Sequence, residues 1–104
     1  MNTYPSDDLR LTVTSGPQGP TVYLRGNIDL GTVAGFIAAL YGAGPIVRVD
    51  CEAVTFMDSS GIRALVMANR GHIVYVVRPS PAVRYLLEVT GHAGMILDEQ
   101  LTAG

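Results

Sequence analysis

Residues 54–65, VTFMDSSGIRAL, join a short run of β type, Ile46 to Cys51, to a run with helical spacing. Asp58, Ser59 and Ser60 are therefore expected where a strand ends and a helix begins. The first amides of a helix lack intrahelical partners and carry partial positive charge, so side-chain or phosphate oxygens are favoured there. An N-cap needs only one oxygen, whereas this turn supplies three oxygen-bearing side chains. We therefore treat it as the candidate functional site.

Length and composition bound the class of protein. The chain has 104 residues, 48% of them hydrophobic and only 15% charged, which predicts one compact domain rather than a disordered or two-domain chain. The net charge is −2, and the seven cationic residues are all Arg, spread singly along the sequence. This spacing gives no polybasic patch, so we expect no direct contact with nucleic acid or membrane.

The cysteine content, the first residues and the length of the apolar runs exclude further classes of protein. Cys51 is the single cysteine, so no internal disulfide can form; we expect it to fill the core, with a redox role as the lesser alternative. No Cys/His cluster has zinc-like spacing, and we expect no metal or cofactor. Residues 1–8 are polar and include Pro5, unlike a signal peptide, and no apolar run reaches the ~20 residues of a transmembrane helix. These features predict a cytoplasmic protein.

The first half of the chain predicts a hairpin followed by a helix. Residues 9–14 alternate apolar and polar, a turn cluster spans 15–20, and alternation resumes at 22–24, which is typical of an antiparallel hairpin. Helical spacing then begins behind Asp29, the expected N-cap, and ends at the glycines and proline of 42–45. The apolar residues expected on one face of this helix are Leu30, Val33, Phe36, Ile37, Leu40 and Tyr41.

The second half alternates strands and helices. A strand is expected at 46–51, followed by a helix that begins within one residue of Ser59 and stops at Gly71. A strand is then expected at 72–77, apolar enough to be covered on both faces. Ser80 and Pro81 predict the cap and first residue of a third helix that ends at Gly91. Its expected inner face comprises Val83, Leu86, Leu87 and Thr90. A short last strand is expected at 95–97, with a loose tail from Asp98.

The resulting order, ββαβαβαβ, predicts an α/β fold with a mixed, mostly parallel sheet and packed helices. The most buried strand residues are expected to include Val47, Val49, Ile73, Tyr75 and Val76. The helix residues expected to face them are Leu40, Leu65 and Leu87.

Three motifs resemble one known family. Residues 56–61, Phe-Met-Asp-Ser-Ser-Gly, resemble the phosphorylation loop of the anti-sigma factor antagonists, which are small bacterial STAS-domain proteins. Residues 26–29, Gly-Asn-Ile-Asp, resemble the Gly-x-x-Asp turn of that family, and residues 80–83 resemble the start of its third helix. The resemblance covers about residues 9–98 and implies a single STAS domain over 1–104. Two features depart from the family pattern: Asn27 replaces a commonly acidic residue, and the first two helices look short.

The resemblance also implies a function. Such a protein binds an anti-sigma factor that is also a serine kinase and thereby releases a sigma factor, a mechanism called partner switching. Phosphorylation by the kinase, here on Ser59, would abolish binding, and a phosphatase is a further expected partner. The residues implied to contact the partner are Asp29, Phe56, Met57, Asp58, Ser59, Ser60 and Gly61.

Three other interpretations stay open. Asp29 could be a helix cap with no partner contact. A hydrolytic triad of Ser59 or Ser60 with His72 or His92 is disfavoured because the sequence lacks a Gly-x-Ser-x-Gly elbow, so we expect no enzyme. The chain could also be a STAS module that binds proteins without phosphorylation, in a stress-signalling scaffold or a lipid-transport complex.

Overall fold

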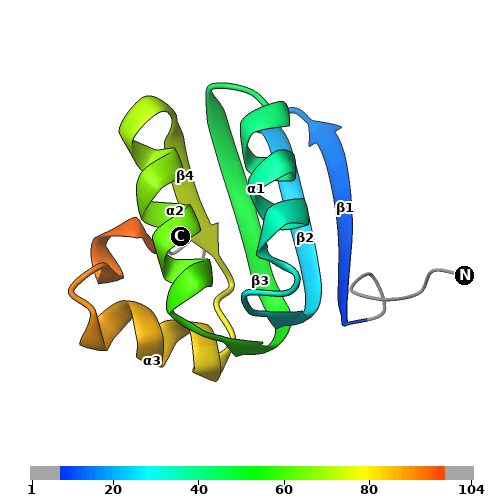
Figure 1. Cartoon of the computed structure of the whole chain (residues 1–104). Helices are drawn as coiled ribbons and strands as arrows, with labels where there is room; N and C mark the ends of the chain where they lie inside the picture. Colours follow the sequence, from blue (N-terminus) through cyan, green and yellow to red (C-terminus); the bar gives the residue numbers. More distant parts are fainter. Residues whose placement is uncertain (1–7, 98–104) are drawn as a thin grey trace, which may run out of the picture.

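A computed structural model describes residues 8–97 of the chain. Its centre is a four-stranded sheet in the spatial order β1-β2-β3-β4 (Figure 1). The strands are β1 (Leu9–Gly16), β2 (Gly19–Ile28), β3 (Ile46–Met57) and β4 (Ile73–Val77). β1 and β2 are antiparallel, whereas β2, β3 and β4 run parallel to one another. The sheet is therefore mixed and mostly parallel, as the sequence predicted.

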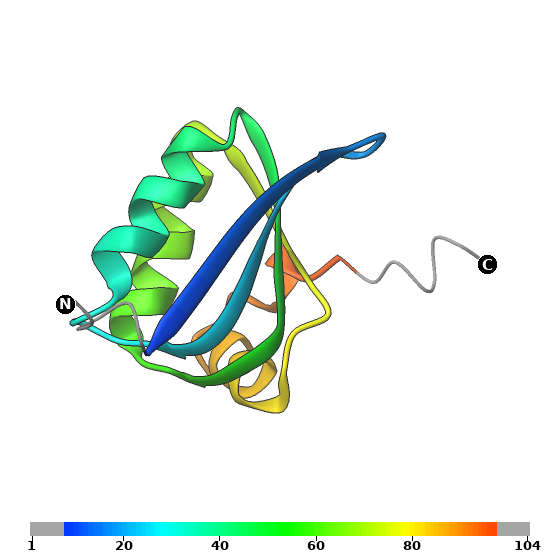
Figure 2. The same cartoon turned by 90° about the vertical axis from the view of Figure 1, so that its right-hand side faces the viewer.

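The two longer helices cover one face of this sheet. Helices α1 (Val33–Gly42) and α2 (Ser59–Gly71) lie side by side on that face, and the opposite face of the strands is left open (Figures 1 and 2). Helix α3 (Pro81–Val89) packs beside β3, and the short 3-10 helix η2 (Ala93–Met95) follows it. The chain thus has one helical face and one sheet face.

The hairpin and the core follow from the alternation of apolar residues. Val22 and Leu24 are buried in β2 while Tyr23 between them is exposed, and the β1–β2 turn closes at Gly19, whose φ of 96° favours glycine. Burial also confirms Cys51 as core. Its thiol lies among apolar groups, and burial raises its pKa to about 12, with the charge of Asp50 adding to the effect. Cys51 therefore stays protonated and unreactive at neutral pH. The largest fully buried side chains are Ile28, Phe36, Leu40, Leu65, Leu87, Val22, Val47, Val49, Val54, Val76 and Val83.

The expectation for β4 was wrong in part. Val74 and Val76 are buried, but Ile73 is 47% exposed and Tyr75 is 37% exposed. β4 ends the row of hydrogen-bonded strands, and α1 and α2 cover one face of the sheet. Ile73 and Tyr75 alternate with the buried Val74 and Val76, and Val77 at the end of the strand is buried as well. An apolar strand covered on one face only buries every second residue, so Ile73 and Tyr75 do not belong to the core.

Several other details differ from the sequence prediction. The strand expected at 46–51 continues to Met57, so residues 54–57 belong to β3 and not to the loop. Helix α1 begins at Val33 rather than behind Asp29, so Leu30 lies in the preceding loop and is 81% exposed. The expected last strand is η2 followed by a single parallel bridge between Ile96 and Val76. Thr90 is the exposed C-cap of α3 instead of an inner-face residue. The tail expected from residue 98 onward lies outside the described residues.

Candidate functional site at the start of helix α2

Asp58 begins helix α2 and holds its first turn. It is the N-cap, and its Oδ1 accepts a hydrogen bond from the amide of Ser60 at 2.9 Å and another from the Ser60 hydroxyl. The hydrogen bond from the Ser60 hydroxyl is the main reason that the pKa of Asp58 is lowered. Burial is the next-largest cause and raises this pKa in part, while the amides of Ser60, Gly61 and Leu30 lower it further. The carboxylate is therefore ionised at neutral pH and committed to fixing the turn, as expected from the sequence.

The two serines of the turn differ in their bonding. The Ser60 hydroxyl donates to Asp58 and is half-buried, so it is already engaged. Ser59, the first residue of α2, is exposed, and its hydroxyl makes no hydrogen bond to any residue in the range 8–97. Of the two, only Ser59 presents a free hydroxyl at the surface. This confirms the predicted exposed position of Ser59 at the helix start, whereas its role as a phosphate acceptor stays a prediction.

Met57 and Gly61 support the turn from beneath. Both are buried, Met57 with 5% of its surface exposed. A Cβ added at Gly61 would lie 2.6 Å from Met57 Cγ and 2.9 Å from Ile28 Cγ2, so only glycine lets α2 approach the strands this closely. The expectation that these two residues contact a partner directly conflicts with their burial. Phe56, which is 49% exposed, is the apolar residue that the turn presents to solvent.

The loop between β2 and α1 lies against the same turn. The amide of Asp58 donates to the carbonyl of Ile28 at 3.1 Å, and the amide of Leu30 contributes a hydrogen bond to the Asp58 carboxylate. Asp29 precedes Leu30, so it lies on the same rim as Asp58. The structure thereby brings together two segments that are about thirty residues apart in the sequence.

Asp29 shapes this loop rather than capping the helix directly. Its Oδ1 accepts from the amides of Gly31 at 2.9 Å and Thr32 at 3.2 Å. The buried Thr32 hydroxyl accepts from the Asp29 amide at 3.0 Å and donates to the Asn27 carbonyl at 3.0 Å. Sequence reasoning missed Thr32, although its spacing of three residues from Asp29 is typical of such reciprocal side-chain to backbone bonding.

Asn27, where the family commonly has an acidic residue, is paired across the strands. Its Oδ1 accepts a hydrogen bond from the Thr55 hydroxyl at 2.8 Å. β2 and β3 are registered so that Asn27 lies opposite Phe56, close to the end of both strands. A neutral amide at this position therefore joins the two strands just before the candidate site.

An apolar groove continues from the site between the two helices. It encloses about 490 Å³, and its lining includes Leu30, Ile37, Tyr41, Ser60, Arg63 and Met67. Helix α1 has no charged residue, yet Ile37 and Tyr41 on its outer side are exposed, as is Met67 on α2. Contiguous exposed apolar surface with a polar rim is typical of protein-binding sites.

The histidines do not form a catalytic arrangement with either serine. His72 Nδ1 lies 3.0 Å from the Gly44 carbonyl, and His92 Nδ1 lies 3.2 Å from the Thr90 hydroxyl. His92 lines the surface beside Ser59, but no hydrogen bond joins the two. Among residues 8–97 there is no group of His, Cys, Asp and Glu that could hold a metal ion, and no helix is long and apolar enough to cross a membrane.

The fold and the site together define a STAS domain. The chain belongs to the STAS family: the family model described as "Mlab, STAS domain" matches residues 11–98. A comparison with curated protein sequences finds no match.

Solved structures of anti-sigma factor antagonists share this fold. An anti-sigma factor antagonist from Mycobacterium paratuberculosis is 25% identical, with a TM-score of 0.77 over 93% of this chain and 94% of that one. The anti-sigma factor antagonist SpoIIAA in its unphosphorylated form is 24% identical, with a TM-score of 0.68 over 86% and 87% of the two chains. The Bacillus cell fate determinant SpoIIAA in the phosphorylated form is 23% identical, with a TM-score of 0.65 over 86% and 90%.

Proposed function

We propose that this protein is an anti-sigma factor antagonist of the bacterial cytoplasm that acts by partner switching. Unmodified, it binds an anti-sigma factor kinase and so releases a sigma factor; phosphorylated on Ser59, it no longer binds. The observation that carries the proposal is the exposed Ser59 hydroxyl, unbonded within the described chain, beside a Ser60 hydroxyl that is held by Asp58. The likeness to the Mycobacterium paratuberculosis antagonist supports the same function.

In this cycle Ser59 is a substrate and not a catalyst. The kinase supplies ATP, magnesium and the base that accepts the hydroxyl proton, and the γ-phosphoryl group is transferred from ATP to Ser59 Oγ with release of ADP. The chain itself contributes an accessible hydroxyl on a rigid helix start. A phosphatase that hydrolyses the phosphate ester would restore the binding form.

The surface around Ser59 explains why one phosphate would act as a switch. Phe56 and the apolar groove between α1 and α2 offer apolar area to a partner, and Asp29 and Asp58 form the polar rim. Phosphorylation adds about −1.5 to −2 charges to this rim. Desolvating a dianion against a surface shaped for a hydroxyl costs several kcal/mol, and each ~1.4 kcal/mol weakens binding about tenfold.

Calorimetric titration against the cognate anti-sigma factor kinase tests the proposal. Ser59→Ala should bind like wild type but resist phosphate labelling, and Ser59→Asp should bind at least about a hundredfold more weakly, because it places a charge in the interface. Ser60→Ala is the matched control, since it should still accept phosphate. Equal affinity of wild type and Ser59→Asp, or labelling that persists in Ser59→Ala, would refute the switch.

A second candidate function is a STAS interaction module that is not phosphorylated. The matching family model carries the name Mlab rather than that of an antagonist, which favours this alternative. Under it, Phe56 and the α1–α2 groove would still bind a protein, as part of a scaffold or lipid-transport complex. No phosphate would then be incorporated into wild type by any kinase of the source cell, and Ser59→Ala would be indistinguishable from wild type in every partner complex.

A further inference from the structure

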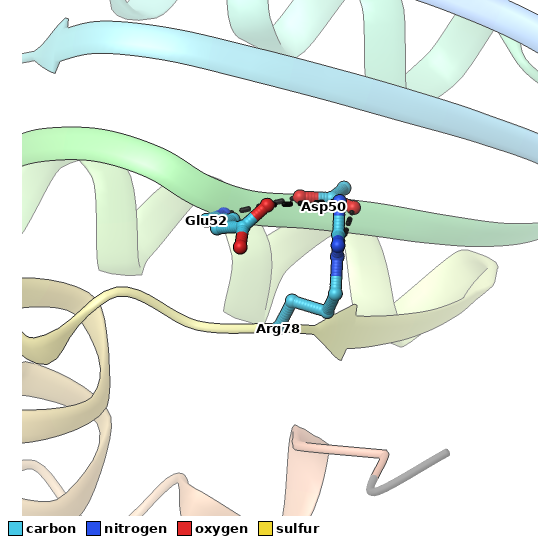
Figure 3. A network of polar contacts seen from close by, with 3 residues as sticks. All are labelled: Asp50, Glu52 and Arg78. Carbon is cyan, nitrogen blue, oxygen red and sulfur yellow. Dashed lines mark hydrogen bonds and ion pairs between the residues drawn. The ribbon is translucent and has the colours of Figure 1, made fainter. Parts of the chain in front are cut away.

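The open face of the sheet carries a polar network that the sequence pattern did not reveal. Asp50 on β3 is buried, and its Oδ2 accepts from Arg78 Nε at 3.0 Å (Figure 3). Arg78 also pairs with Glu52 at 3.0 Å, while Asp50 Oδ1 accepts from the Glu52 amide at 3.1 Å. Arg78 has a φ of 47°, which is uncommon for a residue with a side chain. Its guanidinium charge is thus matched by two carboxylates.

Arg10 and Arg25 line the same region, but neither is paired with a carboxylate in the described chain. They are direct cross-strand partners on β1 and β2, and both are exposed. Their neighbours Leu9 and Leu24 point into the core, so alternation along the strands places both arginines on the opposite face. Like charges directly opposite each other in a sheet are destabilising. Neither guanidinium makes a hydrogen bond or an ion pair within residues 8–97. Within the described part of the chain, two positive charges are therefore adjacent without an ion-pair partner.

Both arginines line one hollow together with the network. The hollow encloses about 330 Å³, and its lining includes Arg10, Thr12, Tyr23, Arg25, Asp50, Glu52 and Arg78. Thr12 and Tyr23 are also cross-strand partners, and Tyr23 is exposed, so two hydroxyl-bearing side chains lie next to the arginine pair. Arginines that are dispersed in the sequence are gathered here by strand pairing, although the whole chain has a net charge of −2.

We propose that this hollow binds the phosphate group of a phosphate monoester. A dianion between Arg10 and Arg25 removes their mutual repulsion and accepts charge-assisted hydrogen bonds, for which the guanidinium fork is well suited. The hydroxyls of Thr12 and Tyr23 are further donors. Arg78 offsets one of the two negative charges of Asp50 and Glu52, so the lining carries three arginines against two carboxylates. This site lies on the face opposite the α2 helix and does not depend on Ser59.

Two-dimensional NMR of the whole chain tests the site with inorganic phosphate and glycerol phosphate, against chloride at matched ionic strength. Shifts should be confined to the hollow and saturate. Arg10→Gln and Arg25→Gln should each weaken binding about tenfold or more, because each removes a charge-assisted hydrogen bond. Arg84→Gln, which alters an exposed arginine on α3, and Ser59→Ala should bind phosphate like wild type.

Vesicles of phosphatidylcholine with and without phosphatidic acid distinguish the source of the phosphate. Sedimentation with phosphatidic acid vesicles that is lost in Arg25→Gln identifies a lipid headgroup, whereas binding of glycerol phosphate alone identifies a soluble ligand; either result supports the site. Without ligand, both glutamine variants should melt no lower than wild type, since they relieve like-charge repulsion. Non-saturating shifts equal to those in chloride, or melting well below wild type in both variants, would overturn the proposal.

Discussion

Gly61 shows how a single side chain controls the site. Gly61→Ala would place a Cβ 2.6 Å from the buried Met57 Cγ and 2.9 Å from Ile28 Cγ2. Either α2 or Met57 must then shift, and we expect destabilisation by about 1–3 kcal/mol, as for other overpacked cores. Chemical denaturation measures this, with Gly71→Ala as control because nothing lies within 4 Å of its added Cβ. The control should be neutral or slightly stabilising; equal effects of the two substitutions would contradict the packing argument.

Asp58 makes the stability of the site depend on pH. Hydrogen bonds from Ser60 and neighbouring amides lower its pKa in the folded state. Its stabilisation is therefore present above the unfolded-state pKa of about 3.9 and is lost as the pH falls through the lower folded-state value. Asp58→Asn should melt below wild type at neutral pH, and this difference should shrink on acidification toward about pH 2. A difference in melting temperature that stays constant over this range would contradict the assignment.

At the scale of single elements, the structure explains where sequence reasoning succeeded and failed. The turn at Asp58 and the start of α3 at Ser80 were predictable because caps depend on a few adjacent residues. The exposure of Ile73 and Tyr75 on β4 could not be predicted in this way. The apolar run from Ile73 to Val77 is equally compatible with one or two covered faces, and only the placement of α1 and α2 on the same face decides between them.

The sequence suggested, but could not establish, that the β2–α1 loop contacts the start of α2. Asp29 and Asp58 share a rim because β2 and β3 pair in parallel, with Ile28 opposite Met57. Sequence spacing contains no information on that register. The same holds for Arg10 and Arg25, whose proximity depends on the hairpin register. Long-range pairing thus supplies the parts of both sites that local patterns could not.

Helix α3 provides an element-scale test of the core. Leu87 is fully buried on its inner side, whereas Val89 on the same helix is 59% exposed. Leu87→Ala should lower the free energy of unfolding by about 2–5 kcal/mol, from lost burial plus a cavity. Val89→Ala should change it by less than about 0.5 kcal/mol. Denaturant titration compares the two; a loss below about 1 kcal/mol for Leu87→Ala would show that α3 is not packed as described.

At the scale of the whole molecule, the two sides of the sheet carry two different kinds of surface. The helical face carries the free Ser59 hydroxyl and an apolar groove, and the open face carries the arginine hollow. The core between them is apolar, and in the described chain every buried side-chain nitrogen and oxygen has a hydrogen-bond partner. Because this core separates the two surfaces, we expect a charge at one of them to leave the structure of the other unchanged.

Charge at Ser59 should therefore change binding without changing the fold. In Ser59→Asp the new carboxylate sits at the first residue of α2, where the helix dipole favours it by about 0.3–1 kcal/mol, and the neighbouring Asp58 opposes it. These effects nearly cancel, so the melting temperature should stay close to that of wild type. Amide NMR shifts should be confined to the first turn of α2 and the β2–α1 loop, with the hollow at Arg10 and Arg25 unaffected. Shifts across the sheet, or destabilisation beyond about 1 kcal/mol, would mean that the charge acts by unfolding the domain instead of blocking an interface.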